Sequence, residues 1–461
     1  MYIEDNICLM SDSYKMCHHS MYLPNTKYVY SYLEARTGAK YNKTVFYGLQ
    51  YLLKKYLCGY VVTQEKIDQA DKIISMHLGP NKFNKEGWEY ILKKYNGKLP
   101  VSIKAVPEGT PVDISNVLMT VVNTDENCAW LTNYLETTLF HVWYSSTVAT
   151  LSREIKILIN HYLQLTKGDN EGIEFMLHDF GMRGATTDEA AAFAGSGHLI
   201  NFRGTDTVPA LMIPINYYNF KDIPGYSVAA TEHSIMTSRA EVGEFDVVKN
   251  LFDKYPDGIL AMVIDSYNFE RFIETLGTKF HDIIMNRNGR VVFRPDSGEP
   301  NTTTLKCFEL LNKYFGSRVN SKGYKVLDDH VRVLWGDGID YDGIRGILYT
   351  LKLNGWSAEN IIFGCGGGLV QKVNRDTQRM AFKCSAQYYD GQWHDVWKKP
   401  LDITKESKRG RLMLIQDENL NFKTIPYGED MKDQDILQEV FRNGDLLIDQ
   451  TFENIRNNAQ I

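Results

Sequence analysis

Long apolar runs, a strong excess of charge of one sign and paired cysteines are all missing from this chain of 461 residues. No stretch reaches the roughly 18 consecutive apolar residues that a membrane-spanning helix needs. The N-terminal sequence "MYIEDNICLM" carries acids early and has no long apolar core, so it does not predict a secretory signal. The formal net charge is only −6, which argues against a protein that coats nucleic acid through a basic face.

Cysteine, linker and low-complexity content narrow the class further. The seven cysteines are scattered and include no C-x-x-C pair, so neither a disulfide framework nor a zinc site is expected. No low-complexity tract or long Pro/Gly/Ser linker occurs. A hydrophobic content of 43% is ample for two or three domains, or for one large α/β barrel with an added layer. We expect a soluble, reduced, cytoplasmic protein without nucleic-acid or membrane partners.

The first third of the chain mixes predicted strands and helices. Residues 27–35 are rich in tyrosine and valine and predict a strand. Apolar residues at helical spacing predict helices in 46–57 and 63–78 and a long helical pair over 126–163. Residues 99–112 have the pattern of a strand, a turn and a second strand.

From about residue 173 the pattern changes to short apolar runs that each end in polar residues or glycine, as in "VVFRPDSGEP". The runs recur about every 30 residues, the length of a strand, a helix and two loops. Seven consecutive units of this kind favour a parallel α/β barrel whose active mouth lies at the strand C-termini. An open doubly wound sheet is the alternative. The residues that mark the strand ends are His178, Asp206, His233, Asp265, Asp296, Asp337 and Gly366.

Two carboxylates and a histidine stand among these strand ends. Asp265 and Asp296 follow neighbouring strands and suit Mg²⁺ that also touches a diphosphate, because magnesium favours one or two carboxylates together with phosphate and water. Helix capping is the alternative role for each aspartate. His233 lies between Glu232 and Ser234, a position suited to a general base or a phosphoryl acceptor, although most histidines have neither role.

Glycines follow two of the strands. The segment "FGCGGGLVQK" (363–372) leads into a helical pattern, so Gly366, Gly367 and Gly368 would let backbone N–H groups approach a phosphate. It matches neither standard nucleotide-binding fingerprint, and a plain turn stays possible. Gly336 and Asp337, in "WGDGID", suit either ribose hydroxyls or a tight turn.

The segment "HDFGMRG" contains the Asp-Phe-Gly triplet that protein kinases carry. We reject a kinase, because no H-R-D-L-x-x-x-N motif precedes it and no glycine-rich loop with a V-A-I-K lysine lies upstream. What remains is Phe180, with Arg183 three positions later. An aromatic ring at a barrel mouth can stack on a planar ligand, whereas packing in the core is the alternative.

Basic residues gather outside the seven units. They would form a polyphosphate site if they converged, and a solvated surface otherwise, which the sequence cannot distinguish. These residues are Arg36, Arg375, Lys383, Lys398, Lys405, Lys408, Arg409 and Arg411.

These motifs, in this order, resemble the nicotinamide phosphoribosyltransferases, and the resemblance extends from "SDSYKMCHHSMYLPNTKYVYSYLEAR" through "HDFGMRG", "NFRGTDTV", "RPDSGEP" and "FGCGGGLVQKVNRD" to "NIRNNAQI". It implies a type II phosphoribosyltransferase fold. The implied α/β fold has an irregular parallel α/β barrel over 151–376 that carries the active-site loops, and a second α+β domain built from both chain ends, 1–150 and 377–461.

The resemblance also implies an activity and its partners. The reaction is the transfer of phosphoribose from phosphoribosyl pyrophosphate to nicotinamide, which gives nicotinamide mononucleotide and pyrophosphate in NAD salvage. Mg²⁺ is the implied cofactor, ATP an optional coupling co-substrate, and the assembly a homodimer with active sites shared between subunits. Asp265 and Asp296 resemble the residues near the metal, and His233 resembles the histidine that ATP phosphorylates.

The pyridine contacts are assigned by motif. Phe180 resembles one face of a nicotinamide sandwich, and Tyr14 of the other subunit resembles the second face. Asp206 resembles the acceptor of the carboxamide NH₂ group. A buried aspartate accepts from an amide and repels a carboxylate, and sites of this kind can reject the wrong analogue by about 10⁴-fold. Nicotinate is therefore expected to be a poor substrate.

The phosphoribose contacts are also assigned by resemblance. Arg183 and Arg294 resemble contacts to nicotinamide and product, while Asp296 and Gly336 resemble ribose contacts. The residues that resemble the 5′-phosphate cradle are Gly366 and Gly367. Those that resemble the pyrophosphate clamp, mostly contributed across the dimer, are Arg36, Arg375, Lys383 and Lys398, with Lys405 on the same basic rim.

Departures from the family pattern are small. Met182 stands where relatives carry tyrosine, and Ala381 where they carry serine near the pyrophosphate. These bear on affinity rather than on reaction type. Two rival interpretations stay open: a phosphoribosyltransferase that uses nicotinate, and a non-catalytic dimer that senses nucleotides.

Overall fold

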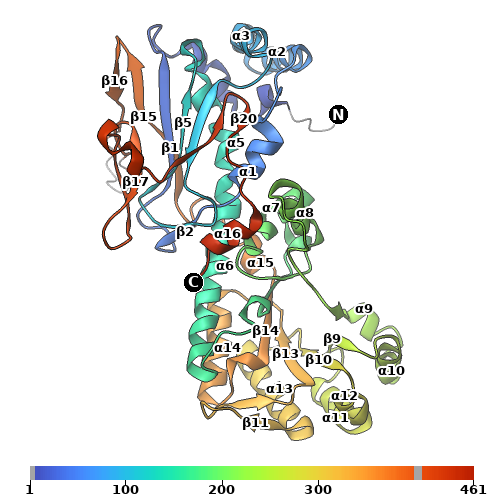
Figure 1. The fold of residues 1–461 in the computed structure, drawn as a ribbon. Coiled ribbons are helices and arrows are strands. Elements are labelled where there is room, and N and C mark those ends of the chain that lie inside the picture. Colours follow the sequence, from blue (N-terminus) through green and yellow to red (C-terminus); the bar gives the residue numbers. More distant parts are fainter. Residues whose placement is uncertain (1–5, 399–406) are drawn as a thin grey trace. The chain divides into compact units, whose positions relative to one another are not determined.

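A computed structural model describes residues 6–398 and 407–461 of the chain (Figure 1). These residues form two compact units. Unit 1 comprises the residues up to Thr150, residues 213–222 and 373–460, and unit 2 comprises 151–212, 223–372 and the last residue. Within the described ranges, no helix is both long enough and apolar enough to cross a membrane.

Unit 1 is built on an antiparallel sheet to which both ends of the chain contribute. Its central strand β1 pairs with β5 on one side and with the C-terminal strand β15 on the other. The predicted strand over 27–35 is therefore confirmed, as is the α+β sheet built from both chain ends. In sheet order the strands are β16 (Gln392–Asp395), β15 (Met380–Tyr389), β1 (Tyr28–Ala35), β5 (Val117–Asn123), β3 (Val101–Ala105), β19 (Gln438–Arg442) and β20 (Asp445–Leu446).

Two small sheets and several helices complete unit 1. The paired strands are β2 (Lys43–Val45) with β4 (Pro111–Asp113), and β17 (Leu412–Gln416) with β18 (Phe422–Pro426). The side chains of Thr63 and Asn84 cap the two longest helices that lie wholly in this unit, α2 and α3. The helices are α1 (Leu49–Leu52), α2 (Gln64–Leu78), α3 (Lys85–Tyr95), α4 (Leu131–Tyr134), α5 (Glu136–Phe140) and α16 (Phe452–Asn458).

Residues 213–222 belong to unit 1, although the residues before and after them in the sequence belong to unit 2. Glu108, which is fully buried, accepts hydrogen bonds from the Tyr218 hydroxyl (2.9 Å) and from two backbone N–H groups at the start of α1. The Gln50 side chain donates to the carbonyl of Tyr217 at 2.7 Å. Burial raises the pKa of Glu108 to about 7. A buried polar network therefore holds this segment, and no motif in the sequence predicts it.

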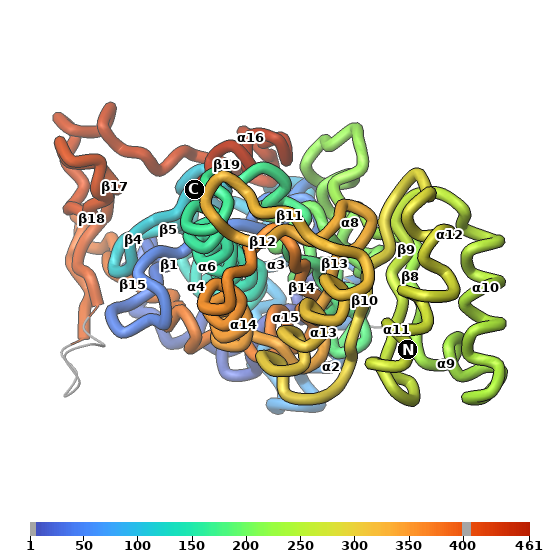
Figure 2. The backbone as a smooth tube through the Cα atoms, turned by 90° about the horizontal axis from the view of Figure 1, so that it is seen from below, coloured from blue at the N-terminus to red at the C-terminus, as the bar shows by residue number. Residues whose placement is uncertain are grey.

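Unit 2 contains a parallel sheet with one strand at or before each of the seven predicted marker positions. Five markers lie in the segment directly after their strand, as predicted, whereas His178 lies within β6 and His233 begins the helix that follows β8. Figure 2 shows α10 beyond the β8–β9 edge of this sheet. In sheet order the strands are β7 (Gly204–Thr205), β6 (Leu177–Asp179), β14 (Ile361–Cys365), β13 (Val331–Trp335), β10 (Gly289–Arg294), β9 (Gly258–Val263) and β8 (Ala229–Ala230).

One short segment joins the two edges of the parallel sheet. Tyr226 forms a parallel bridge with Gly204 of β7, and Ala229–Ala230, three residues later, pair with β9 at the opposite edge. The Thr205 N–H donates to the Tyr226 carbonyl at 2.9 Å. The sheet therefore curls on itself and closes through irregular pairing, which confirms an irregular parallel α/β barrel rather than an open sheet.

Helices connect the strands of unit 2. Helix α13 packs against β13, and α11 and α14 pack against α13. A hairpin of β11 (Ser317–Val319) and β12 (Lys325–Leu327) precedes β13. The helices are α7 (Asp188–His198), α9 (His233–Met236), α10 (Glu244–Lys254), α11 (Phe269–Lys279), α12 (His281–Met285), α13 (Pro300–Phe315), α14 (Tyr341–Leu353) and α15 (Gly367–Val370). Two helices have residues assigned to both units, α6 (Val142–Thr166) and α8 (Val208–Tyr217).

Successive apolar side chains of β10 point to opposite faces of the barrel wall. Val291 and Phe293 are fully buried, and the Phe293 ring lies 6.0 Å from that of Phe315 on α13. Val292 points the other way, into a cluster with Ala261 and Leu334. This alternation follows from the two-residue period of a strand. The barrel interior is therefore apolar up to the strand ends.

Candidate active site

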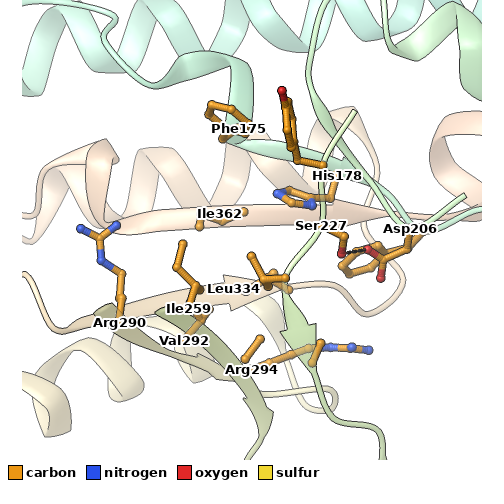
Figure 3. Close-up of a pocket in the computed structure, with 15 residues that line it drawn as sticks. Phe175, His178, Asp206, Ser227, Ile259, Arg290, Val292, Arg294, Leu334 and Ile362 are labelled. Atoms are coloured by element: carbon orange, nitrogen blue, oxygen red, sulfur yellow. Dashed lines mark hydrogen bonds between the residues drawn. The ribbon is translucent and has the colours of Figure 1, made fainter. Parts of the chain in front are cut away.

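The apolar interior of unit 2 opens into a cavity of about 350 Å³, which we call the barrel cavity. Figure 3 shows Asp206 and Arg290 at opposite ends, with Ile259, Val292, Leu334 and Ile362 between them. Three residues that the sequence assigned to the pyridine, Phe180, Asp206 and Arg294, line this one cavity. The other lining residues are Phe175, His178, Tyr226, Ser227, Val228, Ala230 and Ala261.

The ring of Phe180 is held in place by glycine on a neighbouring strand. A Cβ atom at Gly364 in β14 would lie only 2.0 Å from Phe180 Cε2. The guanidinium of Arg294 lies 5.5 Å from the centre of the Phe180 ring, within the range of a cation–π contact. Phe180 is partly buried against the barrel interior. One aromatic face, one cation and an apolar wall therefore meet at the cavity mouth.

Asp206 stands directly after β7 at the same mouth, and its Oδ1 accepts a 2.5 Å hydrogen bond from the Ser227 hydroxyl. The expectation that this aspartate is buried is wrong for the single chain, in which Asp206 is exposed. The cause is the position after a two-residue edge strand, which leaves the carboxylate at the rim. The second carboxylate oxygen is available to an amide N–H of a ligand.

His178 lines the cavity but was only a strand marker in the sequence. Burial lowers the pKa of His178, and the nearby Asp206 carboxylate opposes this effect. The imidazole fits there because Gly204 lies against it, with a Cβ at that position only 2.5 Å from His178 Cδ2. Tyr226, Ser227 and Arg290 were also missed. The first two lie in the motif "GYSVAATEHS", which did signal a strand end.

A second cavity of about 490 Å³, the outer cavity, shares Phe180, Asp206 and Arg294 with the barrel cavity. Arg183 lines it, as does Met182, whose side chain is 38% exposed. The two cavities therefore meet at the three shared residues. A planar ligand at that junction would contact the ring, the carboxylate and the guanidinium together.

His233, Asp265 and Asp296 come together at the ends of β8, β9 and β10. His233 Nε2 lies 3.3 Å from Asp265 Oδ1, and His233 Nδ1 lies 3.8 Å from Asp296 Oδ2. The Asp296 N–H donates to Asp265 Oδ2 at 3.0 Å, and Arg294 donates to Asp296 at 2.9 Å. The Ser297 hydroxyl also donates to Asp265. The imidazole therefore lies between two carboxylates and is within hydrogen-bond distance of one, Asp265.

This pair of carboxylates fits a magnesium ion that shares a diphosphate. The side chain of Asp265 is 7% exposed and that of Asp296 is 22% exposed, so both face a partly open site. The part of the chain that the structure describes contains no group of three or more His, Cys, Asp or Glu side chains arranged to hold a metal by themselves. Mg²⁺ commonly takes one or two carboxylates and completes its shell with phosphate and water.

The glycines of the loop after β14 differ in how much space a Cβ atom would have. A Cβ at Gly368 would lie 2.3 Å from the Ile339 carbonyl oxygen, so packing explains that residue. At Gly367 the nearest atom would be the end of the flexible Gln371 side chain, at 3.2 Å. Gly366 follows β14 directly as the N-cap residue of the short helix α15, which Gly367 begins. Asp337 is exposed, and its carbonyl accepts from the Trp335 indole at 2.9 Å.

Unit 1 contains a separate cavity of about 650 Å³, the basic cavity. Four of the five residues that the resemblance placed in a pyrophosphate clamp line it: Arg36, Arg375, Lys383 and Lys398. The fifth, Lys405, lies outside the described residues. Arg379 is a further cation of this cavity that the sequence did not single out. The lining carboxylates are Asp12, Glu136 and Asp376, and the remaining residues are Tyr14, Thr137, Phe140, His141, Trp143, Met380, Ala381 and Phe382.

The charge of Arg36 in the basic cavity is incompletely compensated. The buried Nε and Nη2 atoms of Arg36 donate no hydrogen bond to any residue that the structure describes, and its ion pair with Glu34 is long, at 3.9 Å. Burial lowers the pKa of Lys383; Glu136 opposes this effect, and the cations Arg36, Lys398 and Arg375 add to it. Desolvated like charges are costly unless an anion joins them. The cavity is therefore suited to an anionic ligand.

Tyr14 shares the basic cavity and is 60% exposed, a high value for a large aromatic side chain. Its neighbour Lys15 is buried and donates to Glu136 at 2.6 Å and to the Asn133 carbonyl at 3.1 Å. Because Lys15 is anchored in this way, the backbone that carries Tyr14 is fixed while its ring stays accessible.

Comparison with known proteins identifies the family. Residues 175–445 match the nicotinate phosphoribosyltransferase (NAPRTase) family, and residues 6–103 match the nicotinamide phosphoribosyltransferase N-terminal domain. The chain is 43% identical to a nicotinamide phosphoribosyltransferase of Xanthomonas campestris pv. campestris, over 100% of this chain and 99% of the relative. It is 32% identical to one of Acinetobacter baylyi, over 96% and 95%.

A solved structure supports the same assignment at the level of the fold. The structure of human nicotinic acid phosphoribosyltransferase is 14% identical, with a TM-score of 0.60 over 98% of this chain and 93% of that chain. Such a likeness shows a shared type II phosphoribosyltransferase fold. The sequence matches extend this to an enzyme class, the pentosyltransferases. The chain therefore belongs to the nicotinamide phosphoribosyltransferases, within the wider nicotinate phosphoribosyltransferase family.

Proposed function

We propose that the protein transfers the 5-phosphoribosyl group from phosphoribosyl pyrophosphate, the donor, to nicotinamide. The products are nicotinamide mononucleotide, which enters NAD salvage, and pyrophosphate. The observation that carries the proposal is the junction of the two cavities of unit 2, where Phe180, Asp206 and Arg294 meet. A flat heterocycle can stack on the ring of Phe180 while its carboxamide donates to Asp206. The names of the matched relatives support the same reaction.

Nicotinate is the second candidate acceptor, because residues 175–445 match a family named for it. Asp206 favours nicotinamide, since a carboxylate that accepts from an amide N–H repels another carboxylate. The exposure of Asp206 in the single chain weakens this repulsion unless bound substrate or a second chain covers the rim. Discrimination therefore depends on how well the assembled site excludes water.

Glycosyl transfer needs positioning and charge stabilisation rather than a protein nucleophile. The bond from the ribose C1 to the pyrophosphate oxygen breaks, and the pyridine nitrogen forms the new bond to C1. We propose that Asp296 and Gly336 contact the ribose, with Asp337 beside them, and that Gly366 and Gly367 hold the 5′-phosphate. Arg183 and Arg294 contact the pyridine and the product. The cations of the basic cavity stabilise the leaving group, and each such contact contributes roughly 1.5–3 kcal/mol.

We propose that Asp265 and Asp296 hold Mg²⁺ together with the diphosphate of the donor. Bound magnesium supplies charge neutralisation to the departing pyrophosphate. The hydrogen bonds from Asp296 N–H and Ser297 hydroxyl fix Asp265 Oδ2, which leaves Oδ1 facing His233. Arg294 fixes one oxygen of Asp296 in the same way.

ATP coupling would act through His233. The 3.3 Å contact with Asp265 suits an Nε2–H donor, which leaves the lone pair on Nδ1 free to attack the γ-phosphorus of ATP. The new bond joins Nδ1 to phosphorus, and ADP leaves. The phosphorylated ring would place about two negative charges beside the two carboxylates that would hold the metal. We expect His233→Ala to keep basal turnover and to lose stimulation by ATP.

We propose a homodimer in which the cavities of unit 2 from one chain and the basic cavity of unit 1 from the other serve one reaction. Tyr14 would then supply the second face of the pyridine sandwich. The proposal rests on family resemblance and on the presence of a ring-binding and an anion-binding cavity on two separate units.

The direct test is an assay of initial rates with nicotinamide or nicotinate as acceptor, with donor and Mg²⁺, in which each mononucleotide is quantified by chromatography. We expect nicotinamide to be used far more efficiently. Asp206→Asn should lower the turnover of nicotinamide and reduce the preference for nicotinamide over nicotinate. The control is Asp253→Asn, which alters an exposed carboxylate on α10 and should change neither quantity. A faster reaction with nicotinate in the unaltered protein would assign the enzyme to the other acceptor.

A further inference from the structure

Arg379 is a cation of the basic cavity that neither the motifs nor the family pattern assigns. It lines the cavity together with Arg36, Lys383 and Ala381. Ala381 brings no polar atom to this wall, so the donors near it come from the residues on either side. We propose that Arg379 is an additional binding residue for the pyrophosphate group of the donor and product. The proposal rests on the proposed function and deepens it.

The backbone places Arg379 next to Arg36. The Arg36 N–H donates to the Arg379 carbonyl at 3.4 Å, directly beyond the end of the β1–β15 ladder, where Ala35 pairs with Met380. Two arginines that share a cavity wall repel each other, and Arg36 already has buried donors without a described acceptor. An anion bound between them would offset this repulsion and give the buried donors of Arg36 an acceptor.

The loop that contains Thr37 and Gly38 contacts the Arg379 side chain. Its Nη1 donates to the Thr37 carbonyl at 3.0 Å. Gly38 lies beneath the guanidinium at φ 84°, and a Cβ there would be only 2.5 Å from Arg379 Nη1. The loop therefore leaves room for the guanidinium, and the hydrogen bond to Thr37 helps to orient it. An oriented fork is the arrangement that suits bidentate contact with phosphate oxygens.

The backbone of Arg379 is itself unusual. Its φ is 46°, in the left-handed region that non-glycine residues seldom occupy. Such conformations cost free energy and persist where the surroundings enforce them, often at binding sites. The strain at Arg379 places the residue at the turn into β15, with its side chain on the cavity wall rather than in solvent.

The test replaces Arg379 by residues chosen to respect this backbone. Arg379→Asn removes the charge and tolerates the left-handed conformation. Arg379→Lys keeps the charge but loses the planar fork. The control is Arg442→Ala, which removes one positive charge from β19 in the same unit, where Arg442 pairs with Glu439. Inorganic pyrophosphate binding is measured by calorimetry on the full-length protein, and KM for donor and for nicotinamide by initial rates.

We expect Arg379→Asn to weaken pyrophosphate binding about tenfold and to raise the KM for donor by a similar factor, as loss of one charge-assisted contact predicts. The KM for nicotinamide should stay unchanged, Arg379→Lys should fall between, and Arg442→Ala should match the unaltered protein. Unchanged pyrophosphate binding in Arg379→Asn, with the melting temperature preserved, overturns the inference. If Arg379→Asn weakens pyrophosphate binding but the unaltered protein makes no mononucleotide, the proposed function is wrong and the inference about Arg379 still holds.

Discussion

The barrel cavity and the basic cavity have opposite physical characters: one is lined mainly by apolar side chains and the other by charged ones. The barrel cavity is an apolar tube with one ring, Phe180, and only a few polar groups, including Asp206 and Arg294. The basic cavity carries more cations than carboxylates and includes Arg36, whose buried donors find no acceptor among the described residues. We therefore propose that shape and burial select a flat heterocycle in one unit, whereas charge selects a polyphosphate in the other.

The largest expected effect follows from removing a desolvated cation. Lys383→Ala deletes a partly buried ammonium among three other cations. Loss of one charge-assisted contact should raise the KM for donor by roughly 10- to 100-fold, because such contacts contribute about 1.5–3 kcal/mol. The KM for nicotinamide should not change. The measurement is initial-rate kinetics with each substrate varied in turn. An equal rise in the KM for donor and the KM for nicotinamide would contradict the assignment of the two ligands to different cavities.

The reciprocal change is made in the barrel. Gly364→Ala would push its methyl group into the ring of Phe180, which must move because the two carbons would otherwise be 2.0 Å apart. We expect the KM for nicotinamide to rise about tenfold, as for loss of roughly 1.4 kcal/mol of stacking and packing, while the KM for donor stays unchanged. Gly343→Ala on α14 is the control, because Gly343 does not line the cavity. Normal nicotinamide kinetics in Gly364→Ala would show that Phe180 does not contact the pyridine.

In the unaltered protein, ligand binding at the two cavities should differ in its dependence on salt concentration. Screening weakens the attraction between exposed charges as the Debye length shortens from about 10 Å at 0.1 M salt to about 3 Å at 1 M. The affinity for pyrophosphate should therefore fall several-fold over this range, and Arg379→Asn should reduce the slope. Binding of nicotinamide should depend little on salt. The measurement is calorimetric titration with each ligand over a salt series, and equal slopes would refute the division.

The smallest effect on catalysis is expected from Glu108, which lies in unit 1 away from both cavities' linings. Burial raises its pKa from 4.5 to about 7, so the stability it contributes is fully present below about pH 4.5 and is lost as pH rises through 7. The loss amounts to roughly 3 kcal/mol. Relative to Glu65→Gln, an exposed control, Glu108→Gln should flatten this part of the pH dependence of the melting temperature. An unchanged slope would show that Glu108 is not protonated in this range.

The succession of strands along the chain and the positions of most strand ends could be predicted from the sequence, because a buried strand followed by polar residues gives a strong local pattern. The grouping of Phe180, Asp206 and Arg294 followed from the rule that parallel strands end at one mouth. The exposure of Asp206 could not be predicted, since it depends on the two-residue length of β7 and on the segment beyond it.

Features that depend on contacts between distant segments were also beyond the sequence. Gly364 looks like any glycine in a strand until the Phe180 ring is placed against it. Arg379 belongs to the basic cavity only because β1 and β15, far apart in the chain, form one ladder. The place of residues 213–222 in unit 1 depends on the buried Glu108.

The central claim is that the cavities of unit 2 in one chain and the basic cavity of unit 1 in another form one reaction centre. Asp265→Ala inactivates the first, and Arg36→Ala combined with Lys383→Ala inactivates the second. Carrying different affinity tags, the two variants are coexpressed, and the mixed dimer is purified through both tags. Because one of its two sites is intact in a symmetric dimer, we predict about half the activity of the unaltered dimer. Activity no higher than that of either parent variant would contradict the claim.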